Sequence, residues 1–366
     1  MPKAVLITSH FWDSKRKAGF HNIAESLLGK NYEVLFLTGN ASYIHHLKRD
    51  YRAELSGKTE LNKIIHVKGN LKSFVRFTSL HPVNYKNKFL NRLMLPSVKK
   101  YEKALAGFGE LNKFISEAAL IVFESFPGLL WFDHIRKINS RARFVYRVSD
   151  DMRQLKKHPY VIDHERNIID RFDLVSVPSE YFLKIFPGSN TKLQYHGINR
   201  ELFDKDYNNP YKNPATFKFI FTGNAYFDHE FLQIASAAFP EDEFHLFGPL
   251  KTKIRGSNVF YYGETDFMKT IPFIKYADAG MHTLTYTKGA ESFSDSLKVI
   301  QYIYCGLPVI APEFIKNTKY KFFGYKPGDS ESIIKAVKDL KKAGRENQIP
   351  DFIQSWDELT GKLING

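Results

Sequence analysis

Hydrophobic and polar positions alternate along the first half of the chain in the manner of an α/β fold. Short apolar runs predict strands at 4–8, 32–38, 120–123, 144–146, 173–178 and 193–195. Between the first two runs, apolar residues recur at helical spacing from Phe20 to Leu28, and Gly29 ends this helix. Runs that are apolar throughout are typical of parallel sheets buried on both faces. The alternation therefore predicts a doubly wound sheet.

A second series of elements follows a break. Residues 208–214 are polar and contain two prolines, which is typical of a linker. Strands are then predicted at 217–222, 243–247, 259–262, 279–282 and 309–311, and helices at 230–238, 267–276, 296–304, 330–342 and 351–363. The organisation predicts two Rossmann-like halves with a cleft between them.

Length and composition narrow the class of protein. The 366 residues suffice for about two domains, and no apolar run is long enough for a spanning helix. The apolar run at the N-terminus is too short for a signal-peptide core, and the single cysteine, Cys305, excludes a disulfide framework. We expect a soluble, cytoplasmic chain. Neither a P-loop motif nor a G-x-G-x-x-G after the first strand occurs.

Positive charge is concentrated in the first half. The net charge is +14 for the whole chain, +15 for residues 1–200 and −1 for residues 201–366. Residues 71–105 combine aromatic and aliphatic side chains with lysine and arginine, and no acidic residue occurs from Leu61 to Tyr101. Such a segment can lie on an anionic membrane. The alternative is a helix with an ordinary core face and solvated lysines, and the charge asymmetry favours the membrane.

Three strand ends carry candidate chemistry, because open α/β sheets bind ligands at the carboxyl ends of their strands. The strand at 144–146 runs into Asp150 and Asp151, where a carboxylate can act as a general base or cap a helix. The strand at 217–222 runs into Gly223, which lets backbone approach a ligand or simply makes a turn. The third end opens a helix with Ser296, Leu297 and Lys298 in its first turn, a phosphate site in which the lysine supplies charge. The alternative there is a surface lysine.

No metal site is expected. The thirteen histidines include no His-x-x-x-His pair. The one Asp-x-Asp pattern, Asp204-Lys205-Asp206, lies beside the predicted linker rather than at a strand end. A solvated turn is the better interpretation of that pattern than a metal site on a nucleotide diphosphate.

The order and spacing of many short motifs resemble the inverting glucuronosyltransferases of glycosyltransferase family 70, typified by the enzyme that adds glucuronic acid to the lipid-linked xanthan precursor. The resemblance covers nearly the whole chain. The matching stretches include Ser9-His10, Val122-Phe123-Glu124-Ser125, Tyr146-Arg147 with Ser149-Asp150, His196-Gly197, Phe227-Asp228, Tyr262-Gly263-Glu264, Lys298 with Gln301-Tyr302, and Gly306-Leu307-Pro308.

This resemblance implies the GT-B glycosyltransferase fold, with two Rossmann-like domains facing a cleft. Residues 1–200 would bind the acceptor and touch the membrane, 201–345 would bind the UDP-sugar, and 346–366 would form a C-terminal helix returning to the first domain. It assigns the catalytic base to Asp150. The donor-site residues that it implies are Gly223 with Asn224 and Ala225 beside it, Glu264, Ser296, Leu297 in place of a methionine, Lys298 and Gln301.

The resemblance further implies transfer of glucuronic acid from UDP-glucuronate to a polyprenyl-diphosphate-linked oligosaccharide, in exopolysaccharide or capsule synthesis. The expected location is the cytoplasmic face of the inner membrane, as a peripheral protein, with no nucleic-acid partner. Because Lys298 and helix N–H groups can stabilise departing UDP, no divalent metal or other cofactor is expected. A tyrosine of the family falls at Leu284, with Tyr286 nearby, so another UDP-sugar stays open. A UDP-sugar epimerase and a non-catalytic polyanion binder are weaker alternatives.

Overall fold

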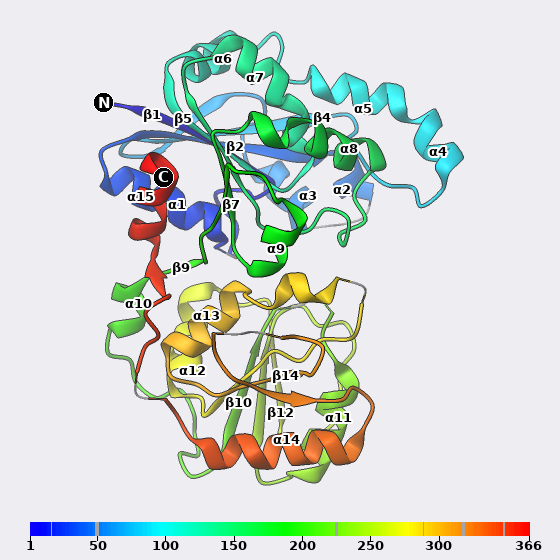
Figure 1. The fold of residues 1–366 in the computed structure, drawn as a ribbon, viewed down its shortest axis with the longest axis vertical. Helices are drawn as coiled ribbons and strands as arrows, with labels where there is room; N and C mark the ends of the chain where they lie inside the picture. Colours follow the sequence, from blue (N-terminus) through cyan, green and yellow to red (C-terminus); the bar gives the residue numbers. More distant parts are fainter. Residues whose placement is uncertain (16, 48–50, 224–225, 288, 317–318, 347) are drawn as a thin grey trace. The chain divides into compact units, whose positions relative to one another are not determined.

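The chain divides into two compact units in a computed structural model that describes all residues except 16, 48–50, 224–225, 288, 317–318 and 347. Unit 1 comprises Met1–Gln194 together with Trp356–Gly366, and unit 2 comprises Tyr195–Ser355. Each unit is a β-sheet with helices packed against it (Figure 1). The α/β class predicted from the apolar runs is confirmed.

Unit 1 is built on an eight-stranded sheet in the order β3-β4-β2-β1-β5-β6-β7-β8. Neighbouring strands pair in parallel, except that β3 runs antiparallel to β4. The strands are β1 (Lys3–Thr8), β2 (Glu33–Ser42), β3 (Ile64–Lys68), β4 (Leu71–Thr78), β5 (Ala118–Glu124), β6 (Arg143–Arg147), β7 (Leu174–Val177) and β8 (Thr191–Leu193).

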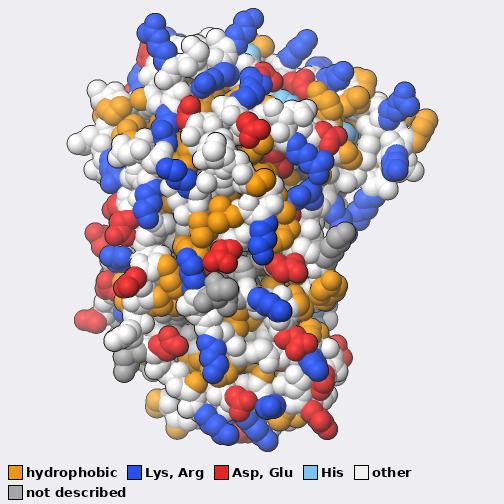
Figure 2. Space-filling view, viewed as in Figure 1, with side chains coloured by type: hydrophobic (Ala, Val, Ile, Leu, Met, Phe, Trp, Pro, Cys, Tyr) orange, Lys and Arg blue, Asp and Glu red, His pale blue; other side chains and the backbone are white. Residues whose placement is uncertain are grey.

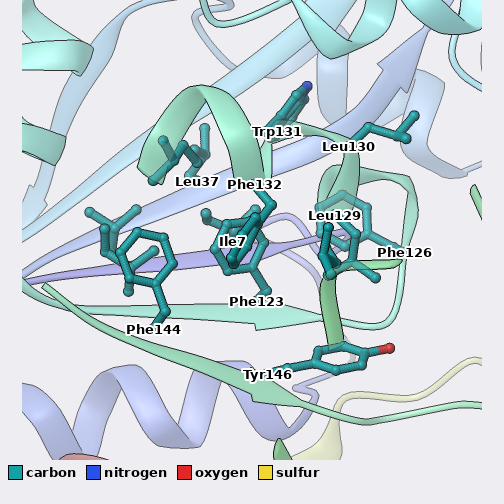
Figure 3. Packing of buried hydrophobic residues seen from close by; sticks show 14 of the residues in the cluster. Ile7, Leu37, Phe123, Phe126, Leu129, Leu130, Trp131, Phe132, Phe144 and Tyr146 are labelled. Atoms are coloured by element: carbon teal, nitrogen blue, oxygen red, sulfur yellow. The ribbon is translucent and has the colours of Figure 1, made fainter. Parts of the chain in front are cut away.

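Helices and short 3₁₀ turns connect the strands of unit 1. They are α1 (Gly19–Gly29), α2 (Tyr43–Leu47), α3 (Tyr51–Lys58), α4 (Lys88–Leu93), α5 (Leu95–Glu102), α6 (Gly109–Ser116), η1 (Pro127–Trp131), α7 (Phe132–Ile138), α8 (Pro159–Ile168), η2 (Ile169–Arg171) and α9 (Glu180–Ile185). The core between η1, α7 and the sheet is aromatic (Figure 3). Phe132 lies at its centre, with ring centroids 5.9 Å from Phe123 and 5.5 Å from Phe144.

Helix α15 (Trp356–Asn365) completes unit 1 although it ends the chain. Its Trp356 ring covers Gly19 of α1, where an added Cβ would lie 3.1 Å from the ring. Asp357 accepts a hydrogen bond from Ser26, and Arg143 of β6 donates to the Leu363 carbonyl at 3.0 Å. The last helix is therefore fixed to both α1 and the sheet of unit 1.

Unit 2 has a six-stranded parallel sheet in the order β12-β11-β10-β13-β14-β15. Its strands are β10 (Lys218–Thr222), β11 (Glu243–Phe247), β12 (Val259–Gly263), β13 (Ala279–Met281), β14 (Val309–Pro312) and β15 (Phe322–Tyr325). Its helices are α10 (Arg200–Asp204), α11 (His229–Ala238), α12 (Phe267–Tyr276), η3 (Ala290–Phe293), α13 (Leu297–Tyr304) and α14 (Ser330–Ala343). A separate pair, β9 (Gly197–Ile198) with β16 (Gln354–Ser355), joins the two ends of the unit.

Three features differ from the sequence expectations. Residues 71–78 form β4 inside the sheet, so Phe74 is buried and the predicted amphipathic segment shrinks to the part that holds α4 and α5. Residues 208–214 are not a linker between the units, because they lie within unit 2 and the buried Tyr211 donates to the Phe273 carbonyl at 2.7 Å. The units divide after residues 194 and 355 rather than 200 and 345, since the β9–β16 pair keeps both stretches in unit 2.

Candidate active site

Three parallel strands of unit 1 bring together the segments that follow them. Ile7 of β1 pairs with Phe123 of β5, and Phe123 pairs with Tyr146 of β6. The loops after β1, β5 and β6 therefore start side by side at the carboxyl edge of the sheet, where open α/β sheets bind ligands. This edge holds Asp150.

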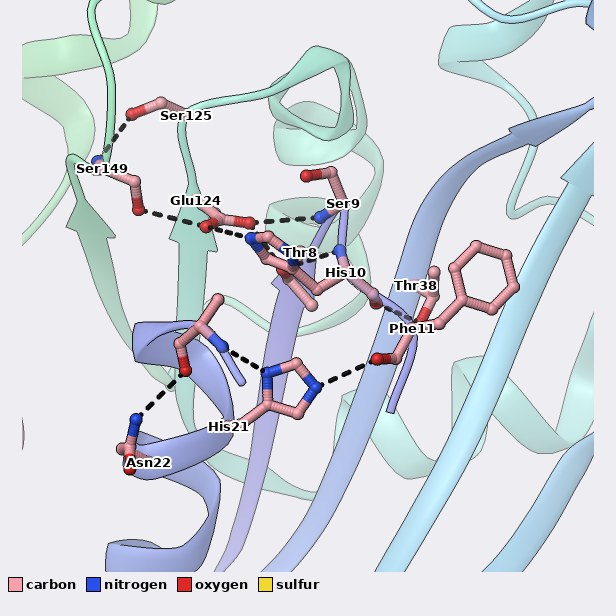
Figure 4. Close-up of polar contacts among 11 residues, drawn as sticks. Thr8, Ser9, His10, Phe11, His21, Asn22, Thr38, Glu124, Ser125 and Ser149 are labelled. Atoms are coloured by element: carbon pink, nitrogen blue, oxygen red, sulfur yellow. Dashed lines mark hydrogen bonds and ion pairs between the residues drawn. The ribbon is translucent and has the colours of Figure 1, made fainter. Parts of the chain in front are cut away.

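Glu124, the last residue of β5, is a buried carboxylate at the centre of this edge (Figure 4). Its Oε2 accepts from the Thr8 hydroxyl and, at 3.1 Å, from the Ser9 N–H. Its Oε1 accepts from Ser149 Oγ at 3.1 Å and lies 3.4 Å from His10 Nε2. Burial alone would raise its pKa, but the neighbouring His10 and the hydrogen bonds from Thr8 and Ser9 lower the pKa to about 2. Glu124 is therefore an ionised group whose lone pairs are already engaged.

Asp150 has the opposite environment. No described residue forms a hydrogen bond or an ion pair with its carboxylate, although the side chain is largely removed from solvent. Burial raises its pKa, and the nearby negative charge of Glu124 raises it further. A desolvated carboxylate with free lone pairs is suited to accept a proton from a hydroxyl group.

The adjacent Asp151, which ends the same strand-to-loop stretch, is fully engaged. Its carboxylate accepts from the Arg153 N–H at 2.9 Å, from the Arg153 guanidinium at 2.9 and 3.0 Å, and from the Tyr181 hydroxyl at 2.9 Å. Although burial raises the pKa of Asp151, these bonds lower it overall. Of these two carboxylates, only that of Asp150 has no bonding partner among the described residues.

In unit 2, helix α13 begins at Leu297 with Ser296 as its N-cap residue. The Ser296 hydroxyl makes no capping bond and is buried without any described partner. The N–H groups of Leu297 and Lys298 also have no acceptor among the described residues. A helix start with free N–H groups attracts anions.

Lys298 lies in the first turn of α13 and points back to the end of β10. Its Nζ lies 4.1 Å from the centroid of the Phe221 ring, and a Cβ added at Gly223 would lie 3.7 Å from it. No described residue forms a hydrogen bond or an ion pair with this ammonium. Burial lowers the pKa of Lys298 to about 7. A desolvated cation without a counter-ion, beside free helix N–H groups, matches a diphosphate.

The turns after the neighbouring strands β10 and β11 each require a glycine. Gly223 has φ +144° and Gly248, after the neighbouring β11, has φ +136°. A Cβ at Gly248 would lie 1.8 Å from the Gly223 carbonyl oxygen, so the two backbones touch. The predicted contacts of Asn224 and Ala225 lie outside the described residues.

The other two predicted donor-site residues occupy different settings. Gln301 is buried on α13, one turn beyond Leu297. Glu264 is exposed directly after β12 and makes no hydrogen bond or ion pair with any described residue. The structure thus places Gly223 beside Lys298, with Ser296 and Gln301 on the same helix as the lysine. Glu264 follows Gly263, whose carbonyl accepts from the Gly248 N–H at 2.8 Å.

Sequence reasoning missed two buried polar groups of unit 2. His282, directly after β13, is fully buried, and burial followed by the charge of Lys298 lowers its pKa well below the usual value. The buried Ser292 hydroxyl, in η3, has no described hydrogen-bond partner. The available signal was position, since His282 follows a strand and Ser292 precedes α13. Nearby, Leu284 is buried whereas Tyr286 is 67% exposed, so no tyrosine is buried at the family's position.

The described part of the chain shows neither a metal-ligand cluster nor a membrane-spanning helix. It contains no group of three or more His, Cys, Asp or Glu side chains arranged to hold a metal ion. Asp204 of the Asp-x-Asp pattern accepts a hydrogen bond from Tyr304 at 2.7 Å and ends α10. Within the same described residues, none of the helices has the length and apolar character needed to cross a bilayer.

Comparisons with known proteins show what the chain is similar to. Residues 6–178 match the family described as the N-terminal domain of glucuronosyltransferase GumK. Over its whole length the chain is 26% identical to the UDP-glucuronate:glycolipid 2-beta-glucuronosyltransferase of Xanthomonas campestris pv. campestris, of which it covers 90%.

Solved structures with a similar fold include sucrose-phosphate synthase from Thermosynechococcus elongatus, with a TM-score of 0.62 and 13% identity over 100% of this chain and 94% of that one. Another is HepE from Anabaena in complex with UDP and glucose, with a TM-score of 0.56 and 15% identity over 99% of this chain and 95% of that one. These similarities confirm the GT-B glycosyltransferase fold expected from the sequence.

Proposed function

We propose that the chain transfers glucuronic acid from UDP-glucuronate to a lipid-linked oligosaccharide, because residues 6–178 match the family described as the N-terminal domain of glucuronosyltransferase GumK. The observation that carries the proposal is the relationship over the entire chain to an enzyme named for UDP-glucuronate and a glycolipid. The unpaired Lys298 at a helix start supports the diphosphate part of the donor. The acceptor is a polyprenyl-diphosphate-linked oligosaccharide used in exopolysaccharide or capsule synthesis.

The proposed mechanism is a single in-line displacement. Asp150 takes the proton from an acceptor hydroxyl, and that oxygen forms a bond to the anomeric carbon as the bond from this carbon to the UDP oxygen breaks. The configuration at the anomeric carbon is thereby inverted. Support comes from the free lone pairs and raised pKa of Asp150, in contrast to the engaged carboxylates of Glu124 and Asp151.

The negative charge on departing UDP is stabilised by the Lys298 ammonium, by the N–H groups of Leu297 and Lys298, and by the backbone at Gly223. Because fixed donors and a cation can take over this task, we propose that transfer needs no divalent metal. Turnover unchanged by a chelator is the expected result. Loss of turnover in the chelator, with recovery on adding Mg²⁺ or Mn²⁺, would contradict it.

We further propose that unit 1 binds the cytoplasmic face of the inner membrane through α4 and α5. Phe89 is 73% and Leu93 60% exposed, and the basic side chains around them are Lys86, Lys88, Arg92, Lys99, Lys100 and Lys103. Figure 2 shows Lys/Arg side chains beside hydrophobic ones at the tip formed by α4. Exposed apolar groups ringed by cations suit an anionic lipid surface.

The donor is tested by calorimetric binding of UDP, UDP-glucuronate, UDP-glucose and GDP-mannose to the purified chain without metal. The proposal predicts that UDP binds and that UDP-glucuronate binds more tightly than UDP-glucose. Equal binding of the two UDP-sugars would be consistent with a transferase that uses another UDP-sugar. The exposed Tyr286 and the buried Leu284 favour this alternative. Absence of UDP binding would refute the Lys298 site.

A further inference from the structure

Asp150 has no bonding partner among the described residues, but the residues on both sides of it are anchored. Ser149 donates its N–H to Ser125 Oγ at 3.0 Å and its hydroxyl to Glu124 at 3.1 Å. Asp151 is held by Arg153 and Tyr181. A base that must receive a substrate proton has to keep its oxygens free, so its position is set through the backbone. Successive Cα atoms are only 3.8 Å apart, and movement of Ser149 therefore moves Asp150.

The anchor of Ser149 continues into the core of unit 1. The Tyr146 hydroxyl lies 3.1 Å from Ser125 Oγ and is hydrogen-bonded to Glu165 Oε1 of α8. Tyr146 is 0%, Glu165 4% and Ser125 5% exposed. A phenol has one proton. When Tyr146 donates to Glu165, its oxygen accepts from Ser125, whose oxygen accepts from the Ser149 N–H.

The three side chains thus form one directed row of hydrogen bonds that starts at Ser149 and ends on a carboxyl group. Each hydroxyl donates once and accepts once, an arrangement in which neighbouring bonds strengthen one another. Burial raises the pKa of Glu165 to about 7, despite the Tyr146 hydrogen bond. A buried carboxyl group is costly compared with an apolar side chain of similar size. If this position served only to fill the core, a leucine would be more stable there.

We propose that Ser125, Tyr146 and Glu165 are positioning residues that hold Ser149, and through it the Asp150 carboxylate, in place for proton abstraction. This inference rests on the proposed role of Asp150. In this role the three side chains need not touch the substrate or the reacting atoms. Their contribution lies in keeping the free carboxylate within reach of the acceptor hydroxyl, since misplacement by about 1 Å can cost about 100-fold in rate.

The test compares Tyr146→Phe, Ser125→Ala, Glu165→Ala and Glu165→Gln in the full chain. Tyr101→Phe is the matched control, because it also removes a fully buried tyrosine hydroxyl of unit 1, one that accepts from the Asn40 N–H at 3.2 Å. Initial rates of UDP release are measured with UDP-glucuronate and glycolipid extracted from membranes of the source cells. We expect kcat to fall about tenfold in Tyr146→Phe and Ser125→Ala, with KM for UDP-glucuronate unchanged.

Glu165→Gln keeps an acceptor oxygen for Tyr146, so it should retain more kcat than Glu165→Ala. If the row of hydrogen bonds acts by positioning Asp150, Tyr146→Phe should have no further effect in an Asp150→Asn background. A Tyr146→Phe kcat equal to that of Tyr101→Phe would overturn the positioning role, provided that Asp150→Asn is itself impaired. Normal turnover in Asp150→Asn would overturn both the proposed base and the positioning role.

Discussion

The depressed pKa of Lys298 makes UDP binding a proton-uptake reaction. Burial lowers this pKa to about 7 from the ordinary 10.5, so at pH 8 Lys298 is neutral in about nine-tenths of the free protein molecules. A diphosphate beside Nζ favours the charged form and raises the pKa again. Binding at pH 8 should therefore take up about 0.9 proton. The terminal phosphate of UDP, with a second pKa of about 6, is fully ionised at this pH and contributes no proton.

The same linkage fixes the pH dependence of the affinity. The protein that binds is the protonated form, whose fraction falls about tenfold from pH 8 to pH 9. The dissociation constant should rise about tenfold over this interval, equivalent to about 1.4 kcal/mol. A lysine with an ordinary pKa would leave the affinity unchanged between these pH values.

Titration calorimetry in HEPES and in Tris measures the uptake, because the difference in observed enthalpy between buffers gives the number of protons exchanged. Lys298→Met should abolish the uptake and weaken binding, whereas Lys338→Met, an exposed lysine on α14, should behave as the wild type. Tight UDP binding without proton uptake at pH 8 would refute the assigned environment of Lys298.

Three further outcomes test other parts of the structure. Gly248→Ala forces a methyl group against the Gly223 carbonyl oxygen and should weaken UDP binding at least tenfold while the protein stays folded. Unchanged UDP affinity would show that this turn is not part of the donor site. Because the folded pKa of Glu124 is depressed to about 2, it contributes about 3 kcal/mol to stability above its unfolded pKa of about 4.5, and this is lost as pH falls toward 2. In urea unfolding, Glu124→Gln should therefore lose less stability from pH 5 to pH 3 than the wild type does. Equal losses in the two proteins would contradict the depressed pKa of Glu124. Phe89→Ala with Leu93→Ala should weaken binding to phosphatidylglycerol vesicles about tenfold while leaving UDP affinity intact, and unaltered sedimentation with vesicles would exclude α4.

Much of the fold follows from the sequence because its strands are apolar throughout. Strand β11 and helix α12 have the bounds that the pattern predicts. Strand β4 was missed because Lys72 and Arg76 interrupt its apolar run. In the fold both cations find partners on other segments. Lys72 forms an ion pair with Glu33 at 2.6 Å, and Arg76 donates a hydrogen bond to the Asn62 side chain at 2.8 Å. Such partners are invisible to local periodicity.

Some features of the candidate site also follow from local sequence and others do not. The place of Lys298 in the first turn of a helix was predictable, and a cation there is unfavourable unless an anion binds. The resemblance pointed to Asp150 rather than Asp151, but the residue pattern alone did not show how Asp151 is engaged. Part of that engagement comes from Tyr181, thirty residues further along, whose hydroxyl donates to Asp151. The link between Glu165 and Tyr146 also joins separate elements, and no spacing rule predicts it.

The most direct test of the proposed chemistry is Asp150→Asn, measured for both sugar transfer and UDP binding on the same folded preparation. The mechanism predicts that transfer from UDP-glucuronate falls 10²–10⁴-fold, the usual contribution of a general base, while UDP affinity stays within about twofold. Normal transfer by the folded variant would contradict the assignment of the base.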